Sequence, residues 1–412
     1  MSARGMAPGL TTPGGVLVVL AIAELLAMAP WFSASAVAPT LARVWQLSPV
    51  TTAWLTISVQ LGFVGGALVS AIFTLADRLS TRRLVAGSAA VAAVATLGVA
   101  LSSGITMGIV CRLLTGAALA GVYPPGMKIA AGWFKEGRGL AIGILVGALT
   151  LGSASPHLVR WAVSPAAWRL VLIVAALSAL VGGLLVFLIP NDGPYAAPSP
   201  PFSLAAAPRI LRDRAVALAN LGYLGHMWEV YAMWTWMAVF ITASEHARRG
   251  ADAEVTGLAA LVTFAVVGSG AFGCWLGGKY ADRWGRTLVT SAAMVVSGSC
   301  AIGVGFLFGT PLVALIPLLL VWGVSVVADS AQFSAAVSEL APRDYVGTAL
   351  TLQTSLGFLL TCATIYLLPK VAGAIGWRWS MSVLAIGPAF GVWAMLALRR
   401  RPEALQLAGG AR

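Results

Sequence analysis

Long apolar runs alternate with short polar segments along the whole chain. Twelve of these runs are long enough to cross a bilayer as helices, because a spanning helix needs about 20 mostly apolar residues. The runs are continuous and do not alternate residue by residue, which favours helices over the strands of a membrane barrel. We therefore predict an all-α integral membrane protein. The predicted spans are 14–39, 49–75, 82–104, 106–132, 138–163, 166–190, 214–242, 254–281, 286–308, 310–338, 345–371 and 376–398.

A polar segment divides the twelve spans into two sets of six. The stretch "NDGPYAAPSPPFSLAAAPRILRDRA", residues 191–215, is rich in Pro, Ala and Ser and ends in a basic cluster, which is typical of a linker. We predict a six-helix bundle over 1–190, a cytoplasmic linker over 191–213 and a second six-helix bundle over 214–412.

The two sets of six resemble each other at an offset of 205 residues. "ELLAMAPWF" (24–32) and "EVYAMWTWM" (229–237) share Glu, Ala, Met and Trp at the same spacing, so Glu24 and Trp31 recur as Glu229 and Trp236. Two further pairs at this offset are Asp77 with Asp282 and Arg138 with Arg343. The repeat indicates a tandem duplication of six helices.

Composition agrees with the spans, and the distribution of charge orients them. Only 10% of residues are charged and the mean hydropathy is +0.90, whereas a soluble domain carries about a quarter charged residues. If the N-terminus is inside, seventeen Lys and Arg fall in inner segments and seven in outer ones. By the positive-inside rule, both termini face the cytoplasm of a bacterial-type inner membrane, so the plasma membrane is the expected location. The net charge of +12 then reflects topology and does not indicate nucleic acid.

We predict no metal, no cofactor and no enzymatic activity. The four cysteines all fall inside predicted spans, where a thiol packs as a small apolar group. The segment "GCWLGGKY" (273–280) fits the spacing of a phosphate-binding loop, but it lies inside an apolar run without the strand that such a loop needs. The sequence contains no nucleophile elbow and no metal-ligand spacing.

A loop signature carries a resemblance to the major facilitator superfamily over the whole chain. The pattern Gly-x-x-x-Asp-Arg-x-Gly-Arg is met by Gly278, Asp282, Arg283, Gly285 and Arg286 between the eighth and ninth spans. The loop between the second and third spans keeps Asp77 and its arginines but has Phe73 and Ser80 in place of the glycines. The resemblance implies two six-helix bundles that move around a central path lined by the first, fourth, seventh and tenth spans.

These loops are candidates for a conformational switch. An acid and several arginines at a helix end can form charge-assisted pairs that hold one state and break in the other. The alternative is that the arginines only anchor the topology. The predicted switch residues are Asp77, Arg78, Arg82, Gly278, Asp282, Arg283 and Arg286.

Few ionisable residues lie inside the spans. Each costs at least about 2.5 to 3.5 kcal/mol near the bilayer centre, so such groups normally face a cavity or a partner. Six of them fall on the four spans that the resemblance places along the central path. They are Glu24, Arg112, Lys128, His226, Glu229 and Asp329.

The repeated glutamates are candidates for proton coupling. Glu24 and Trp31 lie on one helical face, as do Glu229 and Trp236, and a pseudo-twofold axis would bring the two faces opposite each other across a cavity. The proposed proton-coupling residues are Glu229, Glu24, His226 and Asp329. The alternative is a protonated glutamate bonded across a helix interface. Glu229 is favoured as the carrier, because only this glutamate has a histidine one turn before it.

The same faces supply candidate substrate-binding residues. Trp31, Met233 and Trp236 follow the glutamates at helical spacing, Gln332 lies one turn after Asp329, and Arg112 could hold a substrate anion. The alternative for the tryptophans is a place in the outer interfacial belt. In the fourth span, Pro124 and Pro125 predict a bend.

The sequence therefore predicts a secondary active transporter that moves a small organic solute by alternating access and is coupled to protons. Export by antiport of a neutral or cationic, partly apolar compound is favoured, because bases are few and "GILVGALTLG" (143–152) weakly resembles the fifth-helix motif of proton-driven exporters. The alternatives are proton-coupled uptake of a small organic anion, and a transporter-like receptor without turnover. The expected partners are the solute, protons and the lipid bilayer, and the chain is expected to act as a monomer.

Overall fold

The chain folds into long helices in a computed structural model that describes residues 12–135, 137–196 and 202–412. Arg4 and residues 197–201 of the predicted linker lie outside the described residues. The first part of the chain forms α1 (Pro13–Met28), α2 (Pro30–Ala36), α3 (Ala38–Val44), α4 (Pro49–Ile72), α5 (Leu75–Arg78), α6 (Thr81–Leu101), α7 (Ile105–Leu119), α8 (Tyr123–Trp133), α9 (Arg138–Ala162) and α10 (Trp168–Leu185). The second part forms α11 (Ala207–Arg212), α12 (Arg214–Arg249), α13 (Thr256–Trp284), α14 (Arg286–Phe306), α15 (Leu312–Ala328), α16 (Ser330–Leu340), α17 (Val346–Ile375), α18 (Trp377–Ser380) and α19 (Ile386–Arg399).

The predicted membrane fold is confirmed. Within the described residues, eleven helical segments are long and apolar enough to cross a membrane, and their bounds follow the predicted spans closely. The remaining predicted span corresponds to α12, which has 36 residues and is less apolar on average because it carries His226 and Glu229 within it and charged residues at its ends. At 1.5 Å per residue, α12 is about 54 Å long, which exceeds the hydrocarbon core.

Several spans are interrupted near their middle, and two of the interruptions follow from proline. The first span breaks at Ala29, because Pro30 has no N–H to continue the ladder of α1. The fourth span breaks between α7 and α8, ahead of Pro124 and Pro125, which confirms the predicted bend. The tenth span breaks at Asp329, which ends α15 and precedes α16, although no proline lies there.

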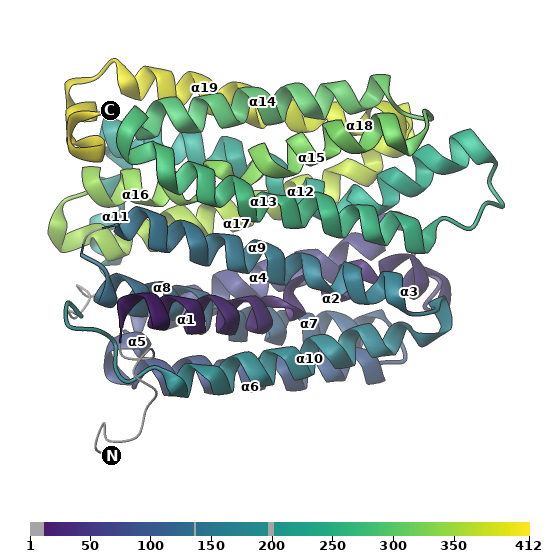
Figure 1. The fold of residues 1–412 in the computed structure, drawn as a ribbon, viewed down its shortest axis with the longest axis horizontal. Helices are drawn as coiled ribbons and strands as arrows, with labels where there is room; N and C mark the ends of the chain where they lie inside the picture. Colours follow the sequence, from purple (N-terminus) through teal and green to yellow (C-terminus); the bar gives the residue numbers. More distant parts are fainter. Residues whose placement is uncertain (1–11, 136, 197–201) are drawn as a thin grey trace.

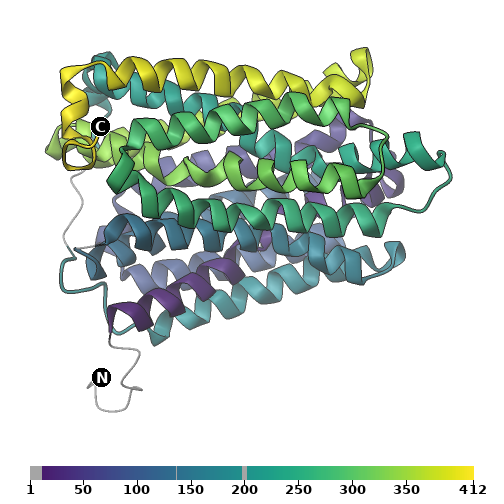
Figure 2. The same cartoon turned by 45° about the horizontal axis from the view of Figure 1, so that its top comes forward.

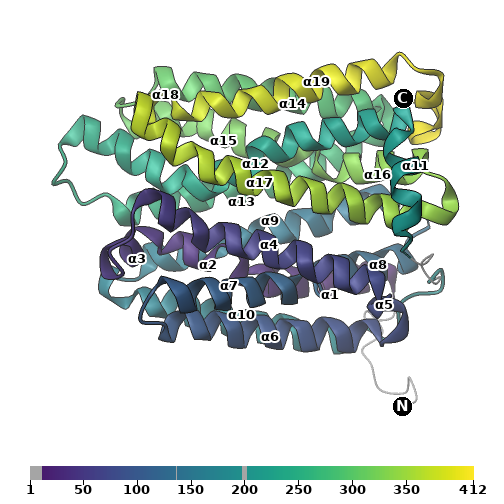
Figure 3. The same ribbon diagram turned by 180° about the vertical axis from the view of Figure 1, so that it is seen from behind.

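The helices form two layers, one from each part of the chain (Figure 1). The helices α1 to α10 lie together in one layer and α12 to α19 in the other, and in the view turned by 45° helices of the second group partly cover those of the first (Figure 2). The layers meet where α9 packs along α13 and, on the opposite side, where α4 packs along α17 (Figure 3). We call the end of the molecule that carries α5, α8, α11 and α16 the arginine-rich end.

Glycines allow the two layers to approach closely along α9 and α13. A Cβ at Gly143 would lie 3.0 Å from the carbonyl oxygen of Cys274, and one at Gly147 would lie 3.2 Å from that of Ala271. Small residues at such positions let membrane helices bring their backbones together. The segment "GILVGALTLG" therefore forms part of the contact between the two halves.

The segment after α19 folds back over the arginine-rich end. The 3₁₀ helix η7 (Pro402–Gly410) buries Ala404 and Leu407 fully. The backbone N–H of Ala408 donates to Glu339 at the end of α16, at 3.1 Å. This segment therefore packs on the same helix ends that hold the second predicted switch loop.

Candidate functional site

Glu229 is held by two hydrogen bonds inside the second half of the chain. The indole Nε1 of Trp322 on α15 donates to Oε1 at 2.7 Å, and the hydroxyl of Ser297 on α14 donates to Oε2 at 2.8 Å. The glutamate is 1% exposed, so these partners replace water. The hydroxyl of Ser297 also lies 3.3 Å from the carbonyl oxygen of Met294, a second acceptor. The side chain of Glu229 thus ties α12 to α14 and α15.

His226, one turn before Glu229 on α12, forms a second polar pair with Asp329. Nδ1 of His226 lies 2.9 Å from Oδ1 of Asp329, and both side chains are buried. The imidazole packs beside Tyr223 and Phe333, with ring centroids 6.1 and 5.6 Å apart. Because Asp329 stands at the break between α15 and α16, this pair joins α12 to that break. The predicted proton-coupling residues of the second half therefore lie on the same pair of helical segments.

Glu24 has different surroundings. It is buried on α1 and its Oε2 faces Gly126 on α8, where a Cβ would come within 2.7 Å of that oxygen. Its Oε1 has no hydrogen-bond partner among the described residues. The predicted juxtaposition of Glu24 and Glu229 is not found in the described contacts, because each packs against helices of its own half. The two glutamates of the sequence repeat therefore have different surroundings in the fold.

Arg112 bonds to the backbone around the break in the first span. Its Nη1 donates to the carbonyl of Pro30 at 2.7 Å, its Nη2 donates to that of Trp31, and its Nε donates to that of Leu55 at 3.0 Å. The side chain is fully buried. Pro30 and Trp31 begin α2 and Leu55 lies within α4, so the guanidinium adds hydrogen bonds to carbonyls of two helices. These bonds occupy donors that the sequence analysis assigned to a substrate anion.

An aromatic cluster joins the two halves beside this break. The ring of Trp31 on α2 lies 4.9 Å from Phe63 on α4, 5.5 Å from Phe358 on α17 and 6.0 Å from Tyr231 on α12. Tyr231 in turn lies 5.4 Å from Trp234. We call these five rings the aromatic cluster. Of these five rings, only that of Trp31 was predicted to bind substrate. The other four could not be distinguished by sequence, because single aromatic residues are common in membrane spans.

Unpartnered polar groups accompany the aromatic cluster. The indole N–H groups of Trp31 and Trp234 are buried, and neither has a hydrogen-bond partner among the described residues. The amide of Gln60, one turn before Phe63 on α4, is fully buried and likewise without a partner in the described part of the chain. Buried polar groups are normally hydrogen-bonded, so such groups are candidates for binding a solute.

Other predicted substrate residues lie elsewhere. Trp236 packs against Trp377 at 5.8 Å, and its Nε1 donates to the carbonyl of Ile365 at 3.1 Å, so its polar atom is already used within the second half. Met233 is completely buried. Gln332 accepts a hydrogen bond from Nη1 of Arg286 at 2.7 Å. The side-chain amide of Gln332 therefore belongs with the predicted switch, while its backbone N–H donates to the carbonyl of Asp329 at 2.9 Å.

The second switch loop forms a network at the arginine-rich end. Arg286 donates from Nε and Nη2 to the two oxygens of Glu339, at 2.7 and 2.5 Å, and its Nη2 lies 3.3 Å from Asp282. Gly278 lies against α9, where its Cβ would be 3.2 Å from the carbonyl of Gly139. Glu339 was not predicted as part of this network, because an acid at a helix end does not by itself indicate which residue it pairs with. Arg283 is exposed.

The first switch loop is paired differently. Asp77 accepts from Nζ of Lys128 on α8 at 2.5 Å, and the same ammonium donates to the carbonyl of Ala76 at 2.8 Å. Arg82 donates to the carbonyl of Ile189 at 2.7 Å, while Arg78 is exposed. Lys128 thus ties α5 to α8.

These features define an integral membrane protein of two packed helical halves, with buried acids in both halves and aromatic side chains between them. A sequence profile described as Major Facilitator Superfamily matches residues 20–365, and the chain belongs to this family of transporters.

Comparisons with individual proteins agree with this assignment. A niacin transporter of Acinetobacter baylyi is 28% identical over 160 residues, which are 38% of this chain and 36% of the relative. A 3-(3-hydroxy-phenyl)propionate transporter of Escherichia coli is 26% identical over 208 residues, 49% of this chain and 50% of the relative. The chain thus spans half or less of the length of these curated relatives.

Solved structures share the fold. A D-xylose-proton symporter has a TM-score of 0.74 with 16% identity, and the comparison covers 95% of this chain and 98% of that one. A bacterial homologue of the human lysosomal transporter Spinster, in an inward-facing and unoccupied conformation, has a TM-score of 0.72 with 16% identity over 97% of this chain and 100% of that one.

Proposed function

We propose that this protein is a proton-coupled secondary transporter that takes up a small aromatic carboxylic acid. The observation that carries the proposal is the aromatic cluster between the two halves, with the free indole N–H groups of Trp31 and Trp234 and the amide of Gln60. Flat apolar walls with a few convergent donors are the composition of a site for a small organic ligand.

The relatives support this class of solute. Niacin and 3-(3-hydroxyphenyl)propionate, the compounds in the printed names of the two curated relatives, both combine an aromatic ring with a carboxyl group. Rings in the aromatic cluster can stack on or meet the edge of such a solute. The carboxyl group would meet N–H donors of neutral side chains, since three donors of Arg112 already bond to backbone carbonyls.

Glu229 is proposed as the proton carrier. As a carboxylate it can accept from both Trp322 and Ser297, but on protonation one oxygen becomes a donor. A tryptophan N–H can only donate, whereas the hydroxyl of Ser297 can turn to Met294 and accept from the new O–H. A proton on Glu229 would therefore rearrange the bond to α14 and leave the bond to α15 in place. The pair of His226 and Asp329 is proposed as the neighbouring relay.

The proposed orientation places the arginine-rich end in the cytoplasm of a bacterial-type plasma membrane, following the asymmetry of Lys and Arg. Both halves of the proposed site lie on one chain, so a monomer suffices. Antiport of a neutral or cationic compound in the export direction is the second candidate, favoured by the absence of a free arginine beside the aromatic cluster within the described residues. A receptor without turnover would bind solute but show no transport.

Purified protein in proteoliposomes tests the proposal. We expect a pH gradient that is acidic outside the vesicles to drive uptake of nicotinate, benzoate or 3-(3-hydroxyphenyl)propionate. The variant Trp31→Phe keeps a ring but loses the indole N–H, and it should raise the KM at least fivefold. The matched control Trp168→Phe removes a tryptophan of α10 outside the aromatic cluster and should leave the KM unchanged. Export of organic cations without uptake of aromatic acids would refute the proposal in favour of the second candidate.

A further inference from the structure

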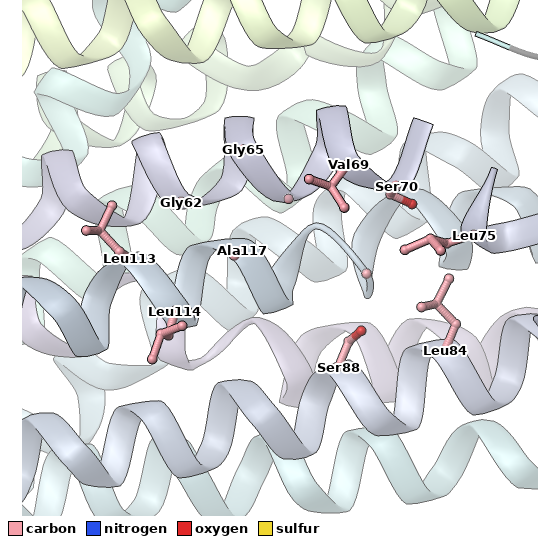
Figure 4. A pocket seen from close by; sticks show the side chains of 12 residues that line it. Gly62, Gly65, Val69, Ser70, Leu75, Leu84, Ser88, Leu113, Leu114 and Ala117 are labelled. Carbon is pink, nitrogen blue, oxygen red and sulfur yellow. The ribbon is translucent and has the colours of Figure 1, made fainter. Parts of the chain in front are cut away.

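Two adjoining hollows lie between α4, α6 and α7 on the outer surface of the first half, away from the contact with the second half. They have volumes of about 430 and 450 Å³ and share Leu84 and Ser88. Figure 4 shows the first hollow, which Leu113 and Leu114 line at one end and Leu75 and Leu84 at the other. We call the two hollows together the lateral groove.

Glycines create the lateral groove. Gly62 and Gly66 bring α4 against α7, because a Cβ at either would collide with the carbonyl oxygens of Leu113 and Ala117, at 2.0 and 2.4 Å. Gly65 and Gly87 have the opposite surroundings, since a Cβ on either would meet nothing within 4 Å. Two glycines therefore join the helices, and two others leave open space beside the joint.

The walls of the lateral groove face the hydrocarbon of the membrane. Val69, Leu114 and Val91 are 49%, 51% and 52% exposed, although all lie within spanning helices. The groove runs from Gly62 to the end of α4 at Ile72, about 15 Å at 1.5 Å per residue. This is half of a hydrocarbon core of about 30 Å, so the length corresponds to one leaflet.

The mouth of the lateral groove is basic. Arg78 and Arg83 line the second hollow at the arginine-rich end, and both are exposed. In the described part of the chain, neither guanidinium takes part in a hydrogen bond or ion pair. Their neighbours are engaged elsewhere, since Arg82 bonds to Ile189 and Asp77 accepts from Lys128.

We propose that the lateral groove binds an anionic phospholipid from the leaflet at the arginine-rich end. One acyl chain lies along Gly65 and Gly87, and the phosphate meets Arg78 and Arg83. Basic residues at the mouth of an apolar groove between spanning helices suit this chemistry, because guanidinium pairs well with phosphate. A bound headgroup would contact α5 beside the pair of Asp77 and Lys128.

Binding to the detergent-purified full-length protein tests the proposal. Phosphatidylglycerol, phosphatidylcholine and glycerol 3-phosphate are titrated separately and followed by native mass spectrometry. We expect phosphatidylglycerol to bind most tightly. Replacing both arginines (Arg78→Gln with Arg83→Gln) should weaken phosphatidylglycerol roughly 25-fold, because each cation near an anionic lipid surface contributes about fivefold. The matched control replaces Arg209 and Arg212, exposed arginines of α11, with Gln and should bind normally.

Filling the groove separates a lipid from a free phosphate compound. Gly65→Leu should weaken phosphatidylglycerol at least tenfold and leave the weak binding of glycerol 3-phosphate unchanged. If the double glutamine variant does not fold, Arg78→Lys with Arg83→Lys should retain most of the affinity. Equal binding of phosphatidylcholine, or phosphatidylglycerol binding that is insensitive to Gly65→Leu, would overturn the proposal.

Discussion

Trp322 donates its indole N–H to Glu229 across the interface between α15 and α12, at 2.7 Å. The bond joins the seventh and tenth spans inside one half, and Ser297 adds the ninth. A buried acid with two donors on different helices is placed to convert a change of protonation into a change of helix contacts.

The first prediction concerns this acid. In a Glu229→Gln protein, pH-gradient-driven uptake should fall at least tenfold, because an amide cannot gain and lose a proton at that site. Exchange of labelled for unlabelled solute needs no net proton movement and should persist. Both rates are measured in the same proteoliposomes.

Glu24→Gln is the matched control for Glu229→Gln. Glu24 faces Gly126 and no described bond joins it to the acids of the second half, so gradient-driven uptake should fall less. Equal losses in the two variants would mean that the coupling site is shared. Normal gradient-driven uptake in Glu229→Gln would remove Glu229 from the coupling role.

The second prediction separates two roles of Arg112. Replacement by Met removes three hydrogen bonds from a buried guanidinium to backbone carbonyls, and a hydrogen bond to a charged group contributes about 1.5 to 3 kcal/mol. We expect a lower Tm in detergent, with solute binding retained by the fraction that remains folded. Arg160→Met is the control, because Arg160 donates only to Val163 among its described contacts. An unchanged Tm with lost binding would show instead that Arg112 holds the solute.

The third prediction concerns the network at the arginine-rich end. Glu339→Gln weakens the two bonds from Arg286, whose side chain is 8% exposed. We expect this end to open more often, measured as faster labelling of a cysteine introduced at Gly139. Glu403→Gln weakens a half-buried pair with Arg401 away from Arg286 and should not change the labelling rate. Identical rates in both variants and the parent protein would limit Arg286 to anchoring the topology.

The fourth prediction tests the contact between the halves. Gly147→Leu places a side chain where even a Cβ lies 3.2 Å from the carbonyl of Ala271, so α9 and α13 should be forced apart. Transport should fall at least tenfold while the amount of folded protein stays the same. The control Gly257→Leu introduces the same side chain on α13 where a Cβ meets nothing within 4 Å, and it should transport normally. Full transport by the Gly147→Leu protein would show that transport does not require close packing of α9 against α13.

Much of the fold could be predicted from the sequence, because a bilayer imposes long apolar runs and proline interrupts helices in a known way. The bend at Pro124 and Pro125 is an example. The break at Asp329 could not be predicted, since no proline lies there and the partner of its side chain, His226, is distant in sequence. The candidate site was harder to predict. The type of a side chain determines whether it can carry a proton or bind a solute, but not which residues it contacts in the fold.

Two residues illustrate that limit. Arg112 looked like an anion ligand, yet its donors bond to carbonyls of α2 and α4, and residue type does not encode which carbonyls a buried guanidinium will reach. Gln332 looked like a neighbour of the central acids because it lies one turn after Asp329. The break between α15 and α16 falls between that acid and the rest of the helix, and Gln332 meets Arg286 instead. The roles of these residues in transport stay predictions.

The three bonds of Arg112 also decide where the molecule can divide when it moves. They connect α7 to α2 and to α4 by directed hydrogen bonds, so these segments travel as one block. Trp31 belongs to α2 and so to this block. Its contacts with Tyr231 and Phe358 are between aromatic rings, which can slide past each other without breaking a hydrogen bond. We therefore expect the shear plane of the transport cycle to pass through the aromatic rings and to leave the hydrogen-bonded backbone of the first span intact.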